Sequence, residues 1–517
     1  MIPRLHAQST DSRRHLTWTD TDNEPPLWPF DGQRRLRKLR VLIDADAWPA
    51  VASGKFTLNE ILAGLLTDPS VEFWRYRDNG PPDELAFTTE NADQVPPGWV
   101  DVSPHGELSF GDGMLDVRVG SGPGSERLAS FDRGLIHMVA GPIASQSSAD
   151  DSDVRQRLLD GRAATVAVAI NADIFITTRD HLLKSDRFVL NCRMTSVAEG
   201  IAIVGLYLRA QDRPTIYRHF DFNGQVTSGT HEFYWVGACG CLPWSWRWRS
   251  VFRKQSELRG EGGWIYEAES VISRLSQALQ ARDRVHIALN RSRSNSSNDD
   301  VASSFDILAL MLLAALDAAA AAISLLYGLP GRDNPSFGNA NWIKEAEKVC
   351  RPITEIFRKG SDGWRMLCAL KVLRNTIHHA ALSPLMIQDG ERPHDRLAIR
   401  LPKSYGRELR HYFEKLGGMK SWGVRHITDE FSFADPGILT DRLLSATIHY
   451  LNNVMEVLPI ERLEGINVSS DDIAPPKAER NTPFHPWSPA YMNSIRWQLA
   501  VDPFIPESLV ADGRDQN

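Results

Sequence analysis

Residues suited to phosphodiester chemistry gather near the end of an apolar stretch, WRMLCALKVLRNTIHHAA, at positions 364–381. Arg374 precedes His378 by four residues and His379 by five, so on a helix the arginine and an imidazole lie within about a turn and a half. A guanidinium can hold a phosphate through two hydrogen bonds, and an imidazole can exchange a proton near neutral pH. The pattern predicts a phosphate-binding site with acid–base chemistry. The alternative is that Arg374 and both histidines are ordinary solvated positions of a helix.

A second set of residues is acidic. Asp44 follows a short β-branched run, LRVLI, and Asp180 follows another, ADIFITT, while Asp160 lies in the helical pattern that leads into the second run. Open α/β sheets place their ligands at the carboxyl ends of parallel strands, so we expect these carboxylates to converge there. Oxygen ligands of this kind suit Mg²⁺ or Mn²⁺. The alternative is that Asp44 and Asp180 only cap the helices that follow the strands.

The elements that must position Arg374 are helical. Apolar residues recur at helical spacing in residues 265–289, 305–327, 342–359, 364–381 and 439–457. Long helices with short connections predict an up-and-down bundle. Asp317 interrupts the apolar helix 305–327 at a position that faces the bundle. A buried carboxylate needs a partner, so we expect a cation beside it, and Arg374 is a candidate.

RNTIHH within an apolar helix resembles the signature of the HEPN family, an arginine followed by a polar residue and then a histidine. The matching positions are Arg374, Asn375 and His379, with His378 as the alternative for the histidine. The resemblance implies an all-α bundle and RNA cleavage without a cofactor, at a site formed between two protomers. In that site Arg374 would bind the scissile phosphate, Asn375 would orient the groups, and the histidine would handle the protons.

The acidic set resembles the PIN-like nucleases. VLIDADAW is similar to the opening strand of that family, and LLDGRAATVAVAINADIFITTRDHLL is similar to its closing unit. FTLNEILAGLL is similar to the helix that carries the second acid of the family. The resemblance implies a parallel-sheet α/β domain in which a bound Mg²⁺ or Mn²⁺ activates water. The implied metal ligands are Asp44, Glu60, Asp160 and Asp180.

The composition excludes several classes of protein. At 517 residues the chain is too long for one core, so two or three domains are expected. A net charge of −7 gives no overall basic footprint, so a nucleic-acid surface must be a local patch. Five unevenly spaced cysteines and an N-terminus without an apolar signal core favour a cytoplasmic protein. The run 305–327 nearly has the length of a membrane span, but its mid-span aspartate and many alanines favour a buried helix.

The chain divides, on these patterns, into five parts. The expected parts are a leader (1–33), a PIN-like α/β domain (34–215) with a Gly/Pro-rich insertion near 75–150, an aromatic and basic connector (216–256), a HEPN-like bundle (257–465) and a C-terminal extension (466–517). In the connector, tryptophans alternate with Arg247 and Arg249. Alternation predicts a strand with an aromatic face and a cationic face, either for stacking RNA bases or as a half-buried connector.

Together the two resemblances imply a cytoplasmic endoribonuclease, toxin-like or antiviral. Its expected partners are RNA, a second copy of the chain and an inhibitory or antitoxin protein. No association with a membrane is expected. The alternative is a non-catalytic RNA-binding or scaffold protein in which both nuclease sites are degenerate.

Overall fold

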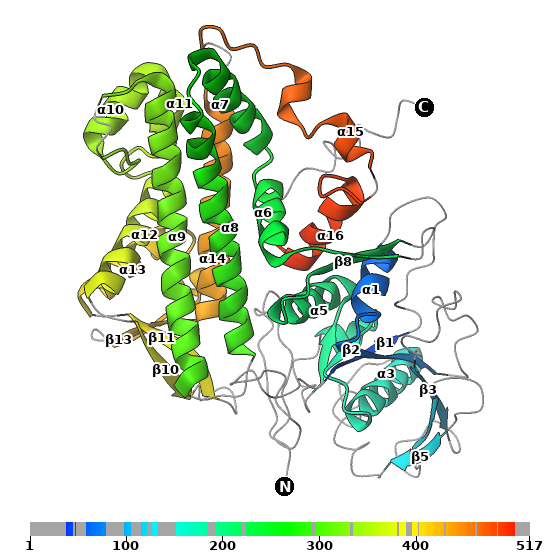
Figure 1. Cartoon of the computed structure of the whole chain (residues 1–517). Coiled ribbons are helices and arrows are strands. Elements are labelled where there is room, and N and C mark those ends of the chain that lie inside the picture. Colours follow the sequence, from blue (N-terminus) through cyan, green and yellow to red (C-terminus); the bar gives the residue numbers. More distant parts are fainter. Residues whose placement is uncertain are drawn as a thin grey trace. The chain divides into compact units, whose positions relative to one another are not determined.

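The computed structural model shows a mixed α/β region followed by a mostly helical region (Figure 1). It describes residues 38–44, 47, 58–78, 98–104, 115–120, 127–131, 151–184, 192–219, 224–290, 295–330, 334–379, 382–388, 395–401, 403–428, 431–460, 463–482 and 484–501. Contacts divide the chain into two units. Unit 1 contains the described residues up to Ser228, and unit 2 contains those from Gly229 onward, apart from two short segments at 290–292 and 388–395.

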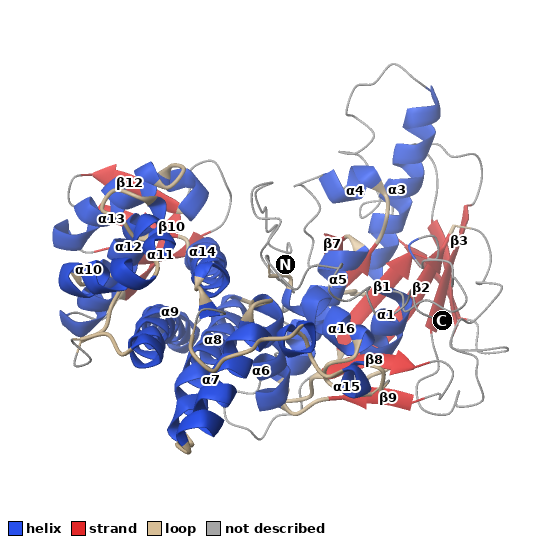
Figure 2. Cartoon of the chain, turned by 90° about the horizontal axis from the view of Figure 1, so that it is seen from above, coloured by secondary structure: helices blue, strands red, loops and turns tan. Residues whose placement is uncertain are grey.

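Unit 1 is built on a seven-stranded sheet with β1 (Leu39–Asp44) near its middle. The strand order is β5-β4-β3-β2-β1-β6-β7, and β1 pairs in parallel with both β2 and β6. Figure 2 shows β1, β2 and β3 side by side in this sheet. The other strands are β2 (Val71–Arg77), β3 (Gly98–Pro104), β4 (Leu115–Gly120), β5 (Arg127–Phe131), β6 (Ile174–Ile176) and β7 (Arg193–Thr195). In this order the neighbouring strands β3, β2, β1, β6 and β7 are all parallel. β4 and β5 form an antiparallel hairpin that extends the sheet beyond β3. The predicted parallel sheet is present, and the hairpin makes it mixed.

Helices cover both faces of this sheet. α3 (Asp151–Ala169) contributes Ala163 and Ala167 to the core that contains Leu42 and Phe175. Ile176 is the next residue after Phe175, so its side chain lies on the opposite face, where Gly200 of α5 (Val197–Ala210) approaches it. A Cβ on that glycine would lie 2.7 Å from Ile176, which explains why a residue without a side chain stands there.

The remaining elements of unit 1 are α1 (Leu58–Leu66), the short α4 (Asp180–Lys184), and a hairpin of β8 (Thr215–His219) and β9 (Gly224–Thr227). α1 packs against β8 and α5. Within 75–150, the stretch expected as an insertion, the described strands β3, β4 and β5 belong to the main sheet. Each of these strands pairs with the strand that precedes it in the chain, so pairing between strands, rather than local composition, decides this placement.

Unit 2 is organised around two long helices that run side by side, α8 (Gly263–Leu289) and α9 (Asn295–Tyr327) (Figure 1). α12 (Asp362–His379) and α14 (Pro436–Val457) pack against α9. All four were predicted, although α9 begins ten residues before the expected start at 305. The expected helix 342–359 is two helices, α10 (Ala340–Val349) and α11 (Arg351–Ile356), because the chain breaks at Cys350 before a proline in the first turn of α11.

A four-stranded sheet in the helical region was not predicted. Its strands are β10 (Ser383–Gln388), β11 (Asp395–Leu401), β12 (Val424–Thr428) and β13 (Phe431–Ala434), in the order β10-β11-β13-β12, and α13 (Lys403–Lys415) lies between β11 and β12 in sequence. The C-terminal region is therefore mostly helical as expected, but it is not all-α. Four strands of four to seven residues carry too little period-two pattern to be separated from loops.

The prediction of a strand through the tryptophan–arginine alternation is wrong. The segment lies in α7 (Ser245–Arg259), which follows α6 (Thr230–Cys241). Trp248 and Phe252 are four residues apart and fully buried, so the helical period continues where the period-two pattern stops. Arg247 points inward and donates hydrogen bonds to the carbonyls of Met455 and Leu458 at the end of α14, so it caps a helix instead of facing RNA.

α9 is the one described helix whose length and apolar composition would allow a membrane span. Of its most apolar stretch, 61% is buried within the protein. Its buried residues include Phe305, Leu308 and Leu312. Burial of this extent is typical of the core helix of a soluble domain, which agrees with the prediction of a bundle helix.

The candidate functional site

α12 positions the Arg374 motif and begins at a capped end. The Ser361 hydroxyl accepts a hydrogen bond from the backbone amide of Trp364, which satisfies one of the free amides of the first turn. Leu370 and Leu373 are buried on the core face, while Arg374 is half-buried and Asn375 is exposed. His378 and His379 belong to the last turn of α12, and their side chains lie outside the described residues.

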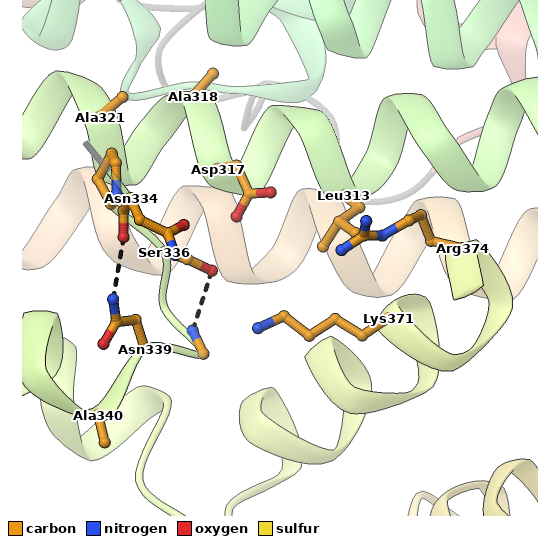
Figure 3. Close-up of a pocket in the computed structure, with 12 residues that line it drawn as sticks. Leu313, Asp317, Ala318, Ala321, Asn334, Ser336, Asn339, Ala340, Lys371 and Arg374 are labelled. Carbon is orange, nitrogen blue, oxygen red and sulfur yellow. Dashed lines mark hydrogen bonds between the residues drawn. The ribbon is translucent and has the colours of Figure 1, made fainter. Parts of the chain in front are cut away.

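A cavity of about 780 Å³ lies beside Arg374 (Figure 3). Lys371 precedes Arg374 by one helical turn, and both side chains extend into the cavity from α12. Asp317 of α9 faces them from the opposite wall, and the segment 334–340 closes a third side. Two cations on one wall and a carboxylate on the other make this a polar cavity in contact with an apolar core.

Asp317 is the electrostatic centre of the cavity. Burial raises the pKa of its carboxyl, and the hydrogen bond from Ser336 and the charges of Lys371 and Arg374 offset only part of this effect. Its Oδ1 has no hydrogen-bond partner among the described residues. Nor does Lys371 or Arg374 form a salt bridge with a described residue, and Nε of Arg374 is also unpartnered there. The expected cations, Lys371 and Arg374, therefore lie near Asp317, but they face its carboxyl across the cavity and form no ion pair with it.

The comparisons with known proteins leave both resemblances untested. No family model, curated protein or solved structure matches this chain. The chemistry of the residues is therefore the basis for assigning a function.

Unit 1 brings acidic residues together at the carboxyl ends of its parallel strands, around a single arginine. Arg179, just after β6, places its Nε 2.5 Å from Oδ2 of Asp44, its Nη2 2.8 Å from Oδ2 of Asp78 and its Nη1 3.4 Å from Oδ1 of Asp160. Thr177 also donates to Asp44, at 3.2 Å. Burial lowers the pKa of Arg179, but Asp44 and Asp78 raise it by more, so the guanidinium is firmly charged.

This arrangement does not fit a divalent cation. The carboxylates that would bind the metal instead contact the guanidinium, which supplies the positive charge that they need. Among the described residues, no cluster of three or more potential ligands has the geometry of a metal site. Oδ2 of Asp160 is buried and has no hydrogen-bond partner in the part of the chain that the structure describes, and burial raises the pKa of that carboxyl.

Two of the four predicted metal ligands meet at Arg179, and the other two have different surroundings. Asp44 and Asp160 are buried and share Arg179. Asp180 begins α4 and is exposed, at a position where a carboxylate favours a helix start. Glu60 lies in the first turn of α1, where its charge adds to the effect of burial and raises the pKa of Tyr217 in β8 to about 12.

Three functional candidates escaped the sequence analysis. Lys371 carried a signal, since its spacing of three residues from Arg374 places both on one face of a helix. Asp78 follows β2 as Asp44 ends β1, so the strand-end rule could have found it. Arg179 carried no such signal, because an arginine after a strand is ordinarily solvated, and only the packing of three elements turns it inward.

Proposed function

We propose that this protein is a cytoplasmic endoribonuclease whose catalytic centre lies on α12. Arg374 binds the scissile phosphate, Asn375 orients it, and His379, or His378 in its place, transfers the protons of the 2′-hydroxyl and the leaving group. The nucleophile is the 2′-hydroxyl of the RNA, so this reaction needs no metal. The products are a cyclic phosphate end and a free 5′-hydroxyl.

The observation that carries the proposal is the cavity in which Arg374 and Lys371 face Asp317. A guanidinium that lacks a salt bridge with any described residue can bind a phosphate without first breaking an internal contact. Asn375, the next residue, is exposed, so a long substrate can reach this end of α12. These features support phosphate binding, and the RNTIHH resemblance supports cleavage.

A second candidate function is RNA binding without cleavage. It is favoured by unit 1, where Arg179 pairs with the carboxylates that a metal-dependent nuclease would need. In that case unit 1 makes no contribution to chemistry, and the cavity of unit 2 only holds phosphates.

The two functions are separated by RNA cleavage with and without EDTA, followed by analysis of the end groups. We expect cleavage that resists EDTA and leaves cyclic phosphates. His379→Ala and Arg374→Gln should each lower the rate, the first by about 10²–10⁴-fold. Arg365→Gln is the matched control, because it removes a cation from the same helix at a surface pair with Asp362. If RNA is bound by every variant and cleaved by none, including the wild type, binding is the function. Cleavage that EDTA abolishes would instead move the chemistry to unit 1.

We also propose that two copies of the chain pair through α12, because one helix supplies few groups to enclose a phosphate. Sedimentation at micromolar concentration should show a dimer, and an active monomer would exclude this pairing. A toxin-like or antiviral role with an inhibitory partner belongs to the same proposal. Induced expression should then arrest growth with the wild type and spare it with His379→Ala.

A further inference from the structure

The cavity extends past Arg374 to a second positive centre. Lys371 reaches the segment 334–340, and its ammonium lies so close to Gly338 that a Cβ on that glycine would overlap it. Ser336 and the start of α10 line the same end. We propose that this end of the cavity binds the terminal phosphate of an RNA strand, held by Lys371 and by Arg374 when Arg374 does not hold a scissile phosphate.

The charges match a terminal phosphate better than a backbone phosphate. Lys371 and Arg374 contribute one positive charge each, and the N-terminus of α10 adds a partial charge of roughly +0.5. The Asn339 side chain already accepts hydrogen bonds from the amides of Asn341 and Trp342, so α10 contributes its dipole and not those two donors. A backbone diester carries one negative charge, whereas a terminal phosphate carries about −1.5 to −2 at pH 7.

Asp317 makes this site sensitive to protons. An ionised carboxylate on the opposite wall repels a phosphate, whereas a protonated carboxyl can donate a hydrogen bond to it. The charged groups that face Asp317 are Lys371 and Arg374 of α12, and Ser336 of the preceding segment donates to it. Burial raises the pKa of the Asp317 carboxyl, and this shifts the carboxyl toward the neutral form that a bound anion favours. Affinity for an anion whose own charge does not change with pH, such as sulfate, should therefore fall as the pH rises.

This inference takes from the proposed function only that the ligand is RNA. Binding can be measured separately from cleavage. Three 2′-O-methyl oligonucleotides of one sequence, with a 5′-phosphate, a 3′-phosphate or neither, cannot be cut through the 2′-hydroxyl. Fluorescence anisotropy should show that one terminal phosphate raises the affinity about tenfold. The end that gives this gain identifies the polarity of the bound strand. Inorganic sulfate, which does not titrate in this pH range, should compete for the site.

Substitutions test the assignment to this cavity. Lys371→Met should abolish the tenfold gain, while Lys348→Met, which removes an exposed lysine of α10, should keep it. Asp317→Asn should bind the phosphorylated oligonucleotide more tightly and lose the pH dependence of sulfate competition. Equal affinities for the three oligonucleotides would overturn the proposal, as would equal losses in the two lysine variants. Cleavage by a protein that ignores terminal phosphates would leave the proposed function intact and remove only this inference.

Discussion

Arg179 and Asp44 form a buried ion pair at the point where β1 and β6 end, with 2.5 Å between Nε and Oδ2. Their strands are neighbours in the sheet although the residues are 135 positions apart. Asp44 is 2% exposed, so its carboxylate meets Arg179 in place of solvent. The pair therefore occupies the edge of the sheet at which open α/β folds place their ligands.

Replacing Arg179 should destabilise unit 1, because the carboxylates around it then lack a cation. Arg179→Met leaves the carboxylates without their cation, and breaking a buried pair in this way typically costs about 3–5 kcal/mol. We expect millimolar Mn²⁺ to restore part of the lost thermal stability in this variant and to leave the wild type unchanged. Thermal unfolding with and without Mn²⁺ measures both effects, with the exposed Arg155→Met as control. A wild type that Mn²⁺ stabilises, and that loses this response in Asp44→Asn, would restore the metal site.

A buried network in unit 2 should be structural. Arg282 of α8 donates to Asp441 of α14 at 2.8 Å and to the Leu499 carbonyl at 2.9 Å, and His286 lies 3.0 Å from the same carboxylate. Arg282→Met should lower the free energy of unfolding by about 3–5 kcal/mol, because a buried carboxylate loses its cation. Arg358→Met, which removes an exposed pair with Glu355, should change it by less than about 0.5 kcal/mol. Urea unfolding compares the two, and similar losses would contradict this assignment.

The same network predicts acid sensitivity. Burial would raise the pKa of Asp441, but His286 and Arg282 lower it by more, to well below the ordinary value of 3.8. A depressed carboxyl pKa contributes stability above pH 3.8 that is lost as the pH falls toward the folded-state pKa. The free energy of unfolding of the wild type, measured with urea, should therefore decrease below about pH 4. Asp441→Asn should be less stable at pH 7 and should lose less on acidification; an unchanged acid slope would argue against this role.

The carboxyl of Asp306 in α9 should make stability depend on pH in the opposite direction. Burial raises the pKa of its carboxyl to about 6. Its stabilising contribution is complete below pH 3.8 and is lost as the pH rises through about 6, because the ionised form is poorly solvated in the folded state. Asp306→Asn should therefore unfold at a Tm roughly 1–3 °C above the wild type at pH 8 and near the wild type at pH 4. Calorimetry at the two pH values decides, and a Tm difference that does not depend on pH would exclude titration of Asp306 as the cause.

Gly338 should control access of Lys371 to its ligand. A Cβ at this position would overlap the Lys371 ammonium, which is the end of a flexible side chain and would have to move aside. Gly338→Ala should therefore weaken binding of the phosphorylated oligonucleotide several-fold while the Tm changes little. Gly263→Ala, whose Cβ would meet no atom within 4 Å, is the matched control. If binding is unchanged in Gly338→Ala, the ammonium does not need its present position.

Periodic, local signals allowed the sequence alone to predict much of this fold. The runs that became β1, β6, α8 and α14 are long or apolar enough for their type to follow from spacing. The placement of Asp44 at the end of a central parallel strand also follows from the sequence, because a β-branched run that stops at an aspartate is a local pattern. The alternation around Trp246 misled the analysis, since six residues cannot distinguish a period of 2 from one of 3.6.

Only the tertiary structure decided which charges meet. Whether Asp44 contacts a metal, water or Arg179 depends on the pairing of β1 with β6, which joins residues more than 130 positions apart. Likewise Asp317 faces Lys371 because α9 and α12 pack together, although 54 residues separate them in the chain. The spacing of apolar residues in a helix or strand indicates which face of that element is buried. Partner choice across elements depends on packing between surfaces, and no single segment encodes it.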